Sequence, residues 1–193
     1  MTKFNNLVKE VKSCTICKDK LSDGVRPVFQ LHPKARILIV GQAPGRKVHE
    51  SGIPFDDASG NRLREWLGIN HEIFYNDEQI AILPMGFCYP GTGKNGDLPP
   101  RPECEPAWRS QLMQQIPNIK ITLVLGMYAQ KYHFGNEYRT LTELVKSWKK
   151  YWPNVIPLPH PSPRNNIWLS KNQWFETELV PKLQTKISSI LTQ

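Results

Sequence analysis

The sequence has no apolar run long enough to span a membrane, and its first residues do not form the pattern of a secretory signal peptide. It also has no internal repeat and no low-complexity segment, which argues against solenoid and fibrous classes. Cysteine is scarce, with four residues in a chain of 193. We therefore expect a cytoplasmic protein that makes no contact with membranes. In that compartment cysteines serve metal binding or redox chemistry more often than disulfides.

The length and charge of the chain indicate how many domains it forms and what kind of partner it binds. A chain of this length suits one α/β domain with a sizeable core, so we expect a single domain over residues 1–193. Lys and Arg number 25 against 17 Asp and Glu, which gives a formal net charge of +8. A folded domain with such an excess suits a polyanionic partner, nucleic acid first. The alternative is that the charge serves only solubility.

Short apolar runs alternate with amphipathic stretches, which predicts an α/β fold with a mostly parallel central sheet. The runs that read as buried strands cover residues 37–40, 80–83, 121–125 and 155–158. Helical spacing of apolar residues and capping signals predict helices near residues 4–11, 58–67, 106–116, 141–148 and 174–191. Two capping boxes are predicted, at Thr140 with Glu143 and at Ser170 with Gln173. Residues 46–51 and 84–106 are predicted as loops.

The first strand runs directly into the turn Gly41-Gln-Ala-Pro-Gly45. In open α/β sheets, ligands bind at the carboxyl ends of the strands. The last strand delivers the segment Pro159-His-Pro-Ser-Pro-Arg-Asn165 to the same edge. Candidate functional residues therefore converge there, although a glycine-rich turn after a strand is also an ordinary structural feature.

The four cysteines have a spacing typical of a metal centre. Cys14 and Cys17 form a C-x2-C pair, and Cys88 and Cys104 lie in the proline-rich loop. Four thiolates complete either a tetrahedral zinc site or a 4Fe–4S cluster. A zinc ribbon usually has two C-x2-C pairs, so the single pair favours the cluster over zinc. The alternative is four unrelated buried thiols.

Three motifs in order resemble those of the uracil-DNA glycosylase superfamily. They are residues 41–45, the segment Pro54-Phe-Asp-Asp-Ala-Ser-Gly60, and the His-Pro-Ser-Pro sequence that begins at His160. The cysteine pattern is similar to that of the iron–sulfur branches, families four and five. The resemblance implies a three-layer α/β/α sandwich. It also implies a monomeric enzyme that hydrolyses the N-glycosidic bond of a damaged base in DNA, uracil first, in base excision repair.

The resemblance also implies a role for each motif residue. Asp57 matches the catalytic aspartate of family five, and His160 would donate a hydrogen bond to the base and stabilise its negative charge. Phe55 would stack on the flipped base, and the backbone around Gln42 and Ala43 would line the base pocket. Contact with DNA is expected from Ser162, Arg164 and Asn165. The four cysteines would hold the 4Fe–4S cluster.

The sequence departs from the family pattern at two places. Gln42 and Ala43 stand where families one and four carry an acid, and Pro84 or Met85 stands near the place of their uracil-reading asparagine. An alternative function is therefore a nucleic-acid-binding protein of the same fold with lost or altered catalysis. A third candidate is an iron–sulfur redox protein.

Several of these residues also have ordinary structural roles. An aspartate before a helix often caps it, so Asp57 is also a candidate cap. Phe55 is also a candidate core residue, and a lone histidine such as His160 is often structural. Arg164 is also a candidate for an ordinary solvated surface residue.

Overall fold

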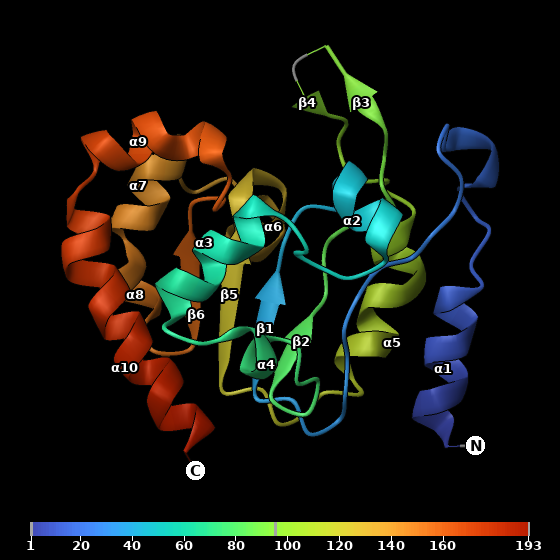
Figure 1. Ribbon diagram of the computed structural model, residues 1–193, viewed down its shortest axis with the longest axis horizontal. Helices are drawn as coiled ribbons and strands as arrows, with labels where there is room; N and C mark the ends of the chain where they lie inside the picture. Colours follow the sequence, from blue (N-terminus) through green and yellow to red (C-terminus); the bar gives the residue numbers. More distant parts are fainter. Residues whose placement is uncertain (1, 95, 193) are drawn as a thin grey trace.

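A four-stranded parallel sheet forms the centre of the computed structural model, which describes residues 2–94 and 96–192 (Figure 1). The strand order is β2-β1-β5-β6. Their bounds are β1 (Ile37–Val40), β2 (Ile80–Ile82), β5 (Ile121–Leu125) and β6 (Val155–Leu158). All residues of β1 and β2 are buried, which explains why these strands read as unbroken apolar runs rather than as alternating patterns.

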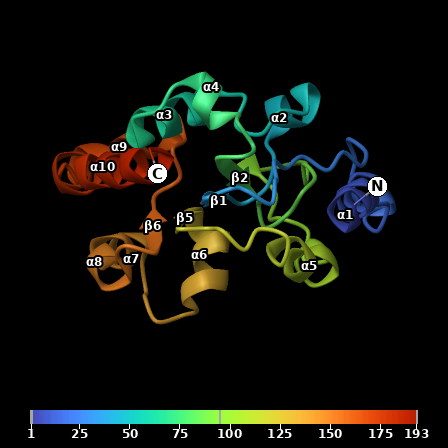
Figure 2. The ribbon, with the colours of Figure 1, turned by 90° about the horizontal axis from the view of Figure 1, so that it is seen from below.

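Helices cover both faces of this sheet, which confirms the predicted three-layer α/β/α sandwich (Figure 2). Ile37 and Ile39 face one core, which they share with α3 (Ala58–Leu67) and α10 (Val180–Leu191). Leu38 and Val40 face the other core, with α1 (Lys3–Lys12), α5 (Ser110–Met113) and α6 (Gly126–Phe134). Successive side chains of a strand point to opposite faces of the sheet, so alternate residues of β1 enter the two different cores.

The remaining elements are short. The helices are α2 (Arg46–Ser51), α4 (His71–Phe74), α7 (Leu141–Lys146), α8 (Trp148–Tyr151) and α9 (Asn166–Lys171). Short 3₁₀ or π turns are η1 (Lys18–Lys20), η2 (Glu105–Arg109), η3 (Pro163–Asn165) and η4 (Phe175–Leu179). The strands β3 (Thr92–Gly93) and β4 (Gly96–Asp97) pair as a small antiparallel hairpin within the predicted 84–106 loop. Within residues 2–94 and 96–192, no helix is both long and apolar enough to cross a membrane.

The prediction of a loop over residues 46–51 is wrong, because these residues form α2. Val48 is the only buried residue of this helix, so the segment has no apolar stripe to reveal it. Its stability comes from its ends. Gly52 adopts the left-handed conformation at the C-cap, and the Arg26 guanidinium donates to the carbonyls of His49 and Glu50.

The second predicted capping box is also wrong. Ser170 lies inside α9, and its hydroxyl donates to the carbonyl of Ile167 instead of capping a new helix. The first box is confirmed, with Thr140 and Glu143 bonding each other's backbone N–H groups.

The helix α6 was not predicted because its buried side includes a polar residue. Gln130 is buried and donates to the carbonyl of Leu158 at 2.8 Å, so it joins α6 to the end of β6.

Candidate functional site

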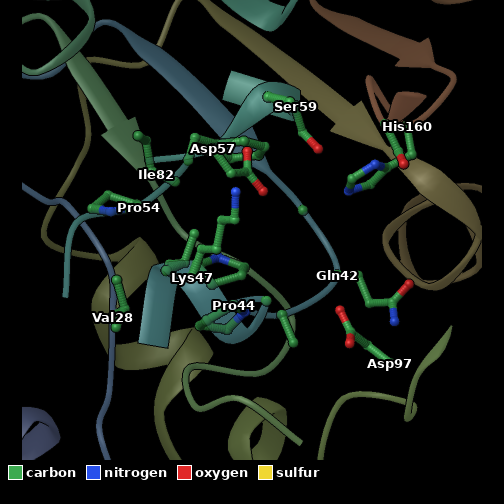
Figure 3. A pocket seen from close by; sticks show the side chains of 18 of the residues that line it. Val28, Gln42, Pro44, Lys47, Pro54, Asp57, Ser59, Ile82, Asp97 and His160 are labelled. Atoms are coloured by element: carbon green, nitrogen blue, oxygen red, sulfur yellow. The ribbon is translucent and has the colours of Figure 1, made fainter. Parts of the chain in front are cut away.

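A pocket of about 540 Å³ lies at the carboxyl edge of the sheet (Figure 3). Its walls come from the loops after β1, β2 and β6, from the start of α3 and from the β3–β4 hairpin. Every residue predicted to act in catalysis, base binding or DNA contact lines it, namely Gln42, Ala43, Phe55, Asp57, His160, Ser162, Arg164 and Asn165. The structure therefore brings together residues that are up to 123 positions apart in the sequence, from 42 to 165.

Asp57 stands at the N-cap of α3. Its Oδ1 accepts a hydrogen bond from the Gly60 N–H at 2.9 Å, so the helix-capping role is real. The side chain also lines the pocket, while the neighbouring Asp56 is exposed and does not. The cap bond fixes the carboxylate at the pocket wall.

Phe55 has the unusual backbone dihedral φ = 57°, in the left-handed region that residues with a Cβ rarely adopt. Such a conformation costs about 1–3 kcal/mol and persists only where the surroundings hold it. The Phe55 ring packs edge-on against Phe74, with 6.1 Å between ring centroids, and lies beside Gly41. Tyr75 donates to the carbonyl of Pro54 at 3.0 Å and so fixes the preceding residue. The strained backbone therefore presents the aromatic ring to the pocket.

Gly60 makes this arrangement possible. A Cβ added there would lie 1.8 Å from the Phe55 carbonyl oxygen, far inside van der Waals contact. Only glycine lets the first turn of α3 approach the strained Phe55 backbone so closely.

The loop after β1 is held by its neighbour after β2. The Met85 and Gly86 N–H groups donate to the carbonyls of Gly41 and Gln42, both at 2.9 Å. The Gln42 side chain reaches the carbonyl of Leu98 at 3.5 Å, so this amide leans toward the β3–β4 hairpin.

His160 follows β6 and packs against Gly126 at the end of β5. An added Cβ on Gly126, whose φ is +77°, would lie 3.6 Å from the imidazole Cδ2. Asn165 donates from Nδ2 to the His160 carbonyl at 2.6 Å and closes the loop on itself. Burial lowers the pKa of His160 below its ordinary value of 6.5, and the negative charges of Asp57 and Asp97 only partly oppose this shift. The imidazole is therefore neutral at pH 7.

The loop after His160 is anchored to α3. Arg62 donates to the Ser162 carbonyl at 3.0 Å and to the Asn166 side chain at 2.8 Å. The Ser162 hydroxyl accepts from the Arg164 N–H and caps η3. The hydroxyl of Ser162 and the amide of Asn165 thus already bond within the chain, whereas the Arg164 guanidinium extends to the hairpin, next to Gly96.

Sequence reasoning missed two charged residues of the pocket, Lys47 and Asp97. Lys47 belongs to α2, and Asp97 to β4, two elements that were predicted as loops. Figure 3 shows Asp97 beside Gln42, with Asp57 on the other side of the pocket. No periodicity or motif pointed to either residue.

The N-terminal segment that carries Cys14 and Cys17 contacts the segment around Cys104. Lys20 donates to Glu103 at 2.6 Å, which joins the segment after Cys17 to the residue before Cys104. Trp108 donates from Nε1 to the Cys14 sulfur at 3.3 Å. Cys17, Cys88 and Cys104 are buried and Cys14 is partly exposed.

The pKa values of the three buried thiols are raised above their ordinary value. Burial, together with the nearby Cys104, Cys14 and Cys17, raises the pKa of Cys88 to about 12. Burial also raises the pKa of Cys17 and of Cys104. Within the part of the chain that the structure describes, however, no three His, Cys, Asp or Glu side chains are placed to hold a metal ion. The predicted cysteine ligand set stays a prediction.

The family model described as "Uracil DNA glycosylase superfamily" matches residues 29–184, which include every residue that lines the pocket except Val28. The chain belongs to the uracil DNA glycosylase superfamily. The predicted resemblance is thereby confirmed.

Four curated relatives are each named type-4 uracil-DNA glycosylase. The chain is 28% identical over 174 residues to a type-4 uracil-DNA glycosylase of Sulfurisphaera tokodaii, covering 84% of this chain and 76% of the relative. It is 28% identical over 178 residues to the type-4 enzyme of Archaeoglobus fulgidus, covering 84% and 83%. A solution structure of a putative uracil DNA glycosylase from Methanosarcina acetivorans aligns with a TM-score of 0.48 at 15% identity, covering 83% and 98%.

Replacing Gly60 by alanine tests the close approach to Phe55. Alanine favours a helix over glycine by about 1 kcal/mol, so local propensity alone predicts stabilisation. The clash with the Phe55 carbonyl predicts the opposite, a loss of about 1–3 kcal/mol in the free energy of unfolding. Urea denaturation measures the difference. Glu65→Ala, an exposed change in the same helix, is the control; an equal or higher stability of Gly60→Ala contradicts the packing argument.

The pKa of His160 is open to direct titration by NMR, with its signal assigned by comparison with His160→Gln. We expect a pKa below 6.5, because burial is the largest cause of its shift. Asp57→Asn should lower the pKa further, since it removes a negative charge that favours the imidazolium ion. Asp56→Asn should leave it unchanged. A His160 pKa above 6.5 in the parent protein contradicts the neutral imidazole.

Proposed function

We propose that this chain is a DNA glycosylase that hydrolyses the N-glycosidic bond of a damaged base, uracil first, in base excision repair. The observation that carries the proposal is the meeting of a fixed carboxylate, a neutral imidazole and a strained aromatic residue in one pocket. Membership of the superfamily and the names of the curated relatives support it.

Cleavage of the glycosidic bond builds positive charge on the sugar and negative charge on the departing base. In the proposed mechanism the Asp57 carboxylate faces the sugar and stabilises the developing cation. One Asp57 oxygen is held by the Gly60 N–H, so the charge is preorganised before the substrate arrives. His160, neutral at pH 7, donates a hydrogen bond to the base carbonyl and stabilises the departing anion without transferring a full charge of its own.

The base must leave the helical stack to reach these groups, which costs a few kcal/mol. In this proposal Phe55 stacks on the extruded base and returns about 1–3 kcal/mol. Gln42 and Ala43 line the same wall, and the Gln42 amide offers both a donor and an acceptor for the polar edge of the base. A side-chain amide of this kind suits uracil, which has carbonyl acceptors on either side of an N–H donor.

We assign contact with the DNA backbone to the rim of the pocket. Arg164 and Lys47 are exposed cations there, which matches the positive net charge of the chain. Ser162 and Asn165 act mainly by shaping the loop that carries His160, because their polar groups already have partners within it.

We further propose that Cys14, Cys17, Cys88 and Cys104 hold a 4Fe–4S cluster. The donor set fits in kind, since four thiols are the ligands that such a cluster takes and three of them are buried. A single zinc ion would draw the sulfurs to about 2.3 Å from one centre. The cysteine spacing, with one C-x2-C pair where a zinc ribbon usually has two, favours the cluster over zinc.

The cluster would supply structural cross-linking rather than chemistry at the base. Contacts between side chains of this protein already connect the same two segments. Lys20, Glu103 and Trp108 bring the N-terminal segment against the loop after β2. Met85 and Gly86 of that loop in turn hold the wall of the pocket through Gly41 and Gln42.

Asp57→Asn and His160→Ala test the proposed function. Each removes one preorganised contact with the transition state, so each should lower the single-turnover excision rate by about 10²–10³-fold. Oligonucleotides that carry uracil, hypoxanthine or xanthine are the substrates, and alkaline cleavage of the abasic product is the readout. Binding to an abasic oligonucleotide should change little.

Asp56→Asn is the matched control, because Asp56 is exposed and lies outside the pocket. It should keep the parent rate. Excision at the parent rate by both Asp57→Asn and His160→Ala would overturn the mechanism. A parent protein that binds DNA but excises no base from any of the three substrates would favour a binding protein of the same fold.

Anaerobic purification tests the cluster. The protein should be brown and contain about four iron and four sulfide per chain. Cys88→Ser should lose iron and folded protein together, since ligand loss removes folding free energy. Ser22→Ala, a change beside the Cys17 segment that alters no thiol, is the control and should retain iron. Stoichiometric zinc without iron or sulfide in the parent protein contradicts the proposal.

A further inference from the structure

The pocket contains a second carboxylate that the mechanism above does not use. Asp97 lines the pocket from β4, at the end of the hairpin. Within the described residues its carboxylate has no hydrogen bond and no ion pair. A carboxylate that faces a pocket and has no partner in the protein is free to contact a substrate or a water molecule.

The position of Asp97 differs from that of Asp57 in two ways. Asp57 has one oxygen engaged by the α3 cap, whereas both Asp97 oxygens are free of such bonds among the described residues. Asp97 is also the more exposed of the two, so its carboxylate is open to solvent. Its Oδ2 lies 3.6 Å from the place that a Cβ on Gly45 would take, at the turn after β1.

The two acids flank the pocket. Figure 3 shows the Asp97 carboxylate beside the Gln42 amide, with Asp57 on the opposite side. The Gln42 side chain reaches the Leu98 carbonyl, which joins the β1 turn to the residue after Asp97. The charges of both acids reach His160, where each favours the imidazolium form. A substrate held between Asp57 and His160 therefore has Asp97 within the same cavity.

We propose that Asp97 is the water-activating carboxylate of this site, which rests on the proposed glycosylase function. The carboxylate accepts a proton from one water molecule as the water oxygen forms its bond to the sugar C1′. The C1′–N bond breaks at the same stage, and its electron pair leaves with the base. Asp97 then releases the proton to solvent, and the base anion takes up a proton from solvent. Asp57 keeps its charge throughout.

Asp97→Asn in the full-length chain tests this role. A lost general base should lower the single-turnover excision rate on the order of 10²-fold, with little loss of affinity for an abasic oligonucleotide. Asp77→Asn is the matched control, since Asp77 is an exposed acid before β2 that lies outside the pocket, and it should keep the parent rate.

Chemical rescue separates a catalytic role from a structural one. Asp97→Ala leaves space for a small carboxylate, so added formate should raise its excision rate in proportion to concentration. Formate should not raise the rate of Asp57→Ala, whose side chain also caps α3.

The outcomes are distinct. An active parent protein whose Asp97→Asn variant excises at the parent rate overturns the role of Asp97 and leaves the glycosylase proposal standing. Loss of activity in Asp97→Ala that formate does not relieve also overturns it. A parent protein without any excision overturns the glycosylase function itself.

Discussion

The contact between Gly60 and the Phe55 carbonyl is the constraint on which the pocket depends. It allows α3 to begin immediately beside a backbone held in the left-handed region. Because the helix begins there, its N-terminal N–H group is available to the Asp57 carboxylate. One close approach thus sets the aromatic face and the charge of the pocket together, and neither can be moved without the other.

The electrostatics of the pocket reflect a balance between burial and charge. Burial disfavours the imidazolium form of His160, and two nearby carboxylates favour it. Burial is the larger influence, so the pocket keeps negative acids and a neutral imidazole side by side. A neutral donor suits a base that leaves as an anion, because it stabilises the new charge without having held an opposite charge in the resting protein.

The buried strands could be predicted from the sequence because each is a short apolar run whose residues face two cores. Phe55, Asp57 and His160 could be selected from the sequence because their motifs resemble those of the superfamily, and all three line the pocket. Residues 46–51 were missed because α2 is held by Arg26 and Gly52 at its ends and not by an apolar stripe. Asp97 was missed for a related reason, since a two-residue strand carries no periodicity. Its place in the pocket arises only from the way the hairpin folds back across the sheet edge.

Asp57 is the N-cap residue of α3, and Arg62 lies in the middle of the same helix. Arg62 donates a hydrogen bond to the loop that carries His160. The distance between the Asp57 wall and the His160 wall of the pocket is therefore set by one helix, α3, and not by two independent loops. On this side, the cavity can be enlarged only by a movement of α3 away from the sheet. Such a movement exposes Leu63 and Trp66, at about 1.5–3 kcal/mol for each fully exposed apolar side chain. The hydrophobic core beneath the helix thus opposes any widening of the pocket on this side.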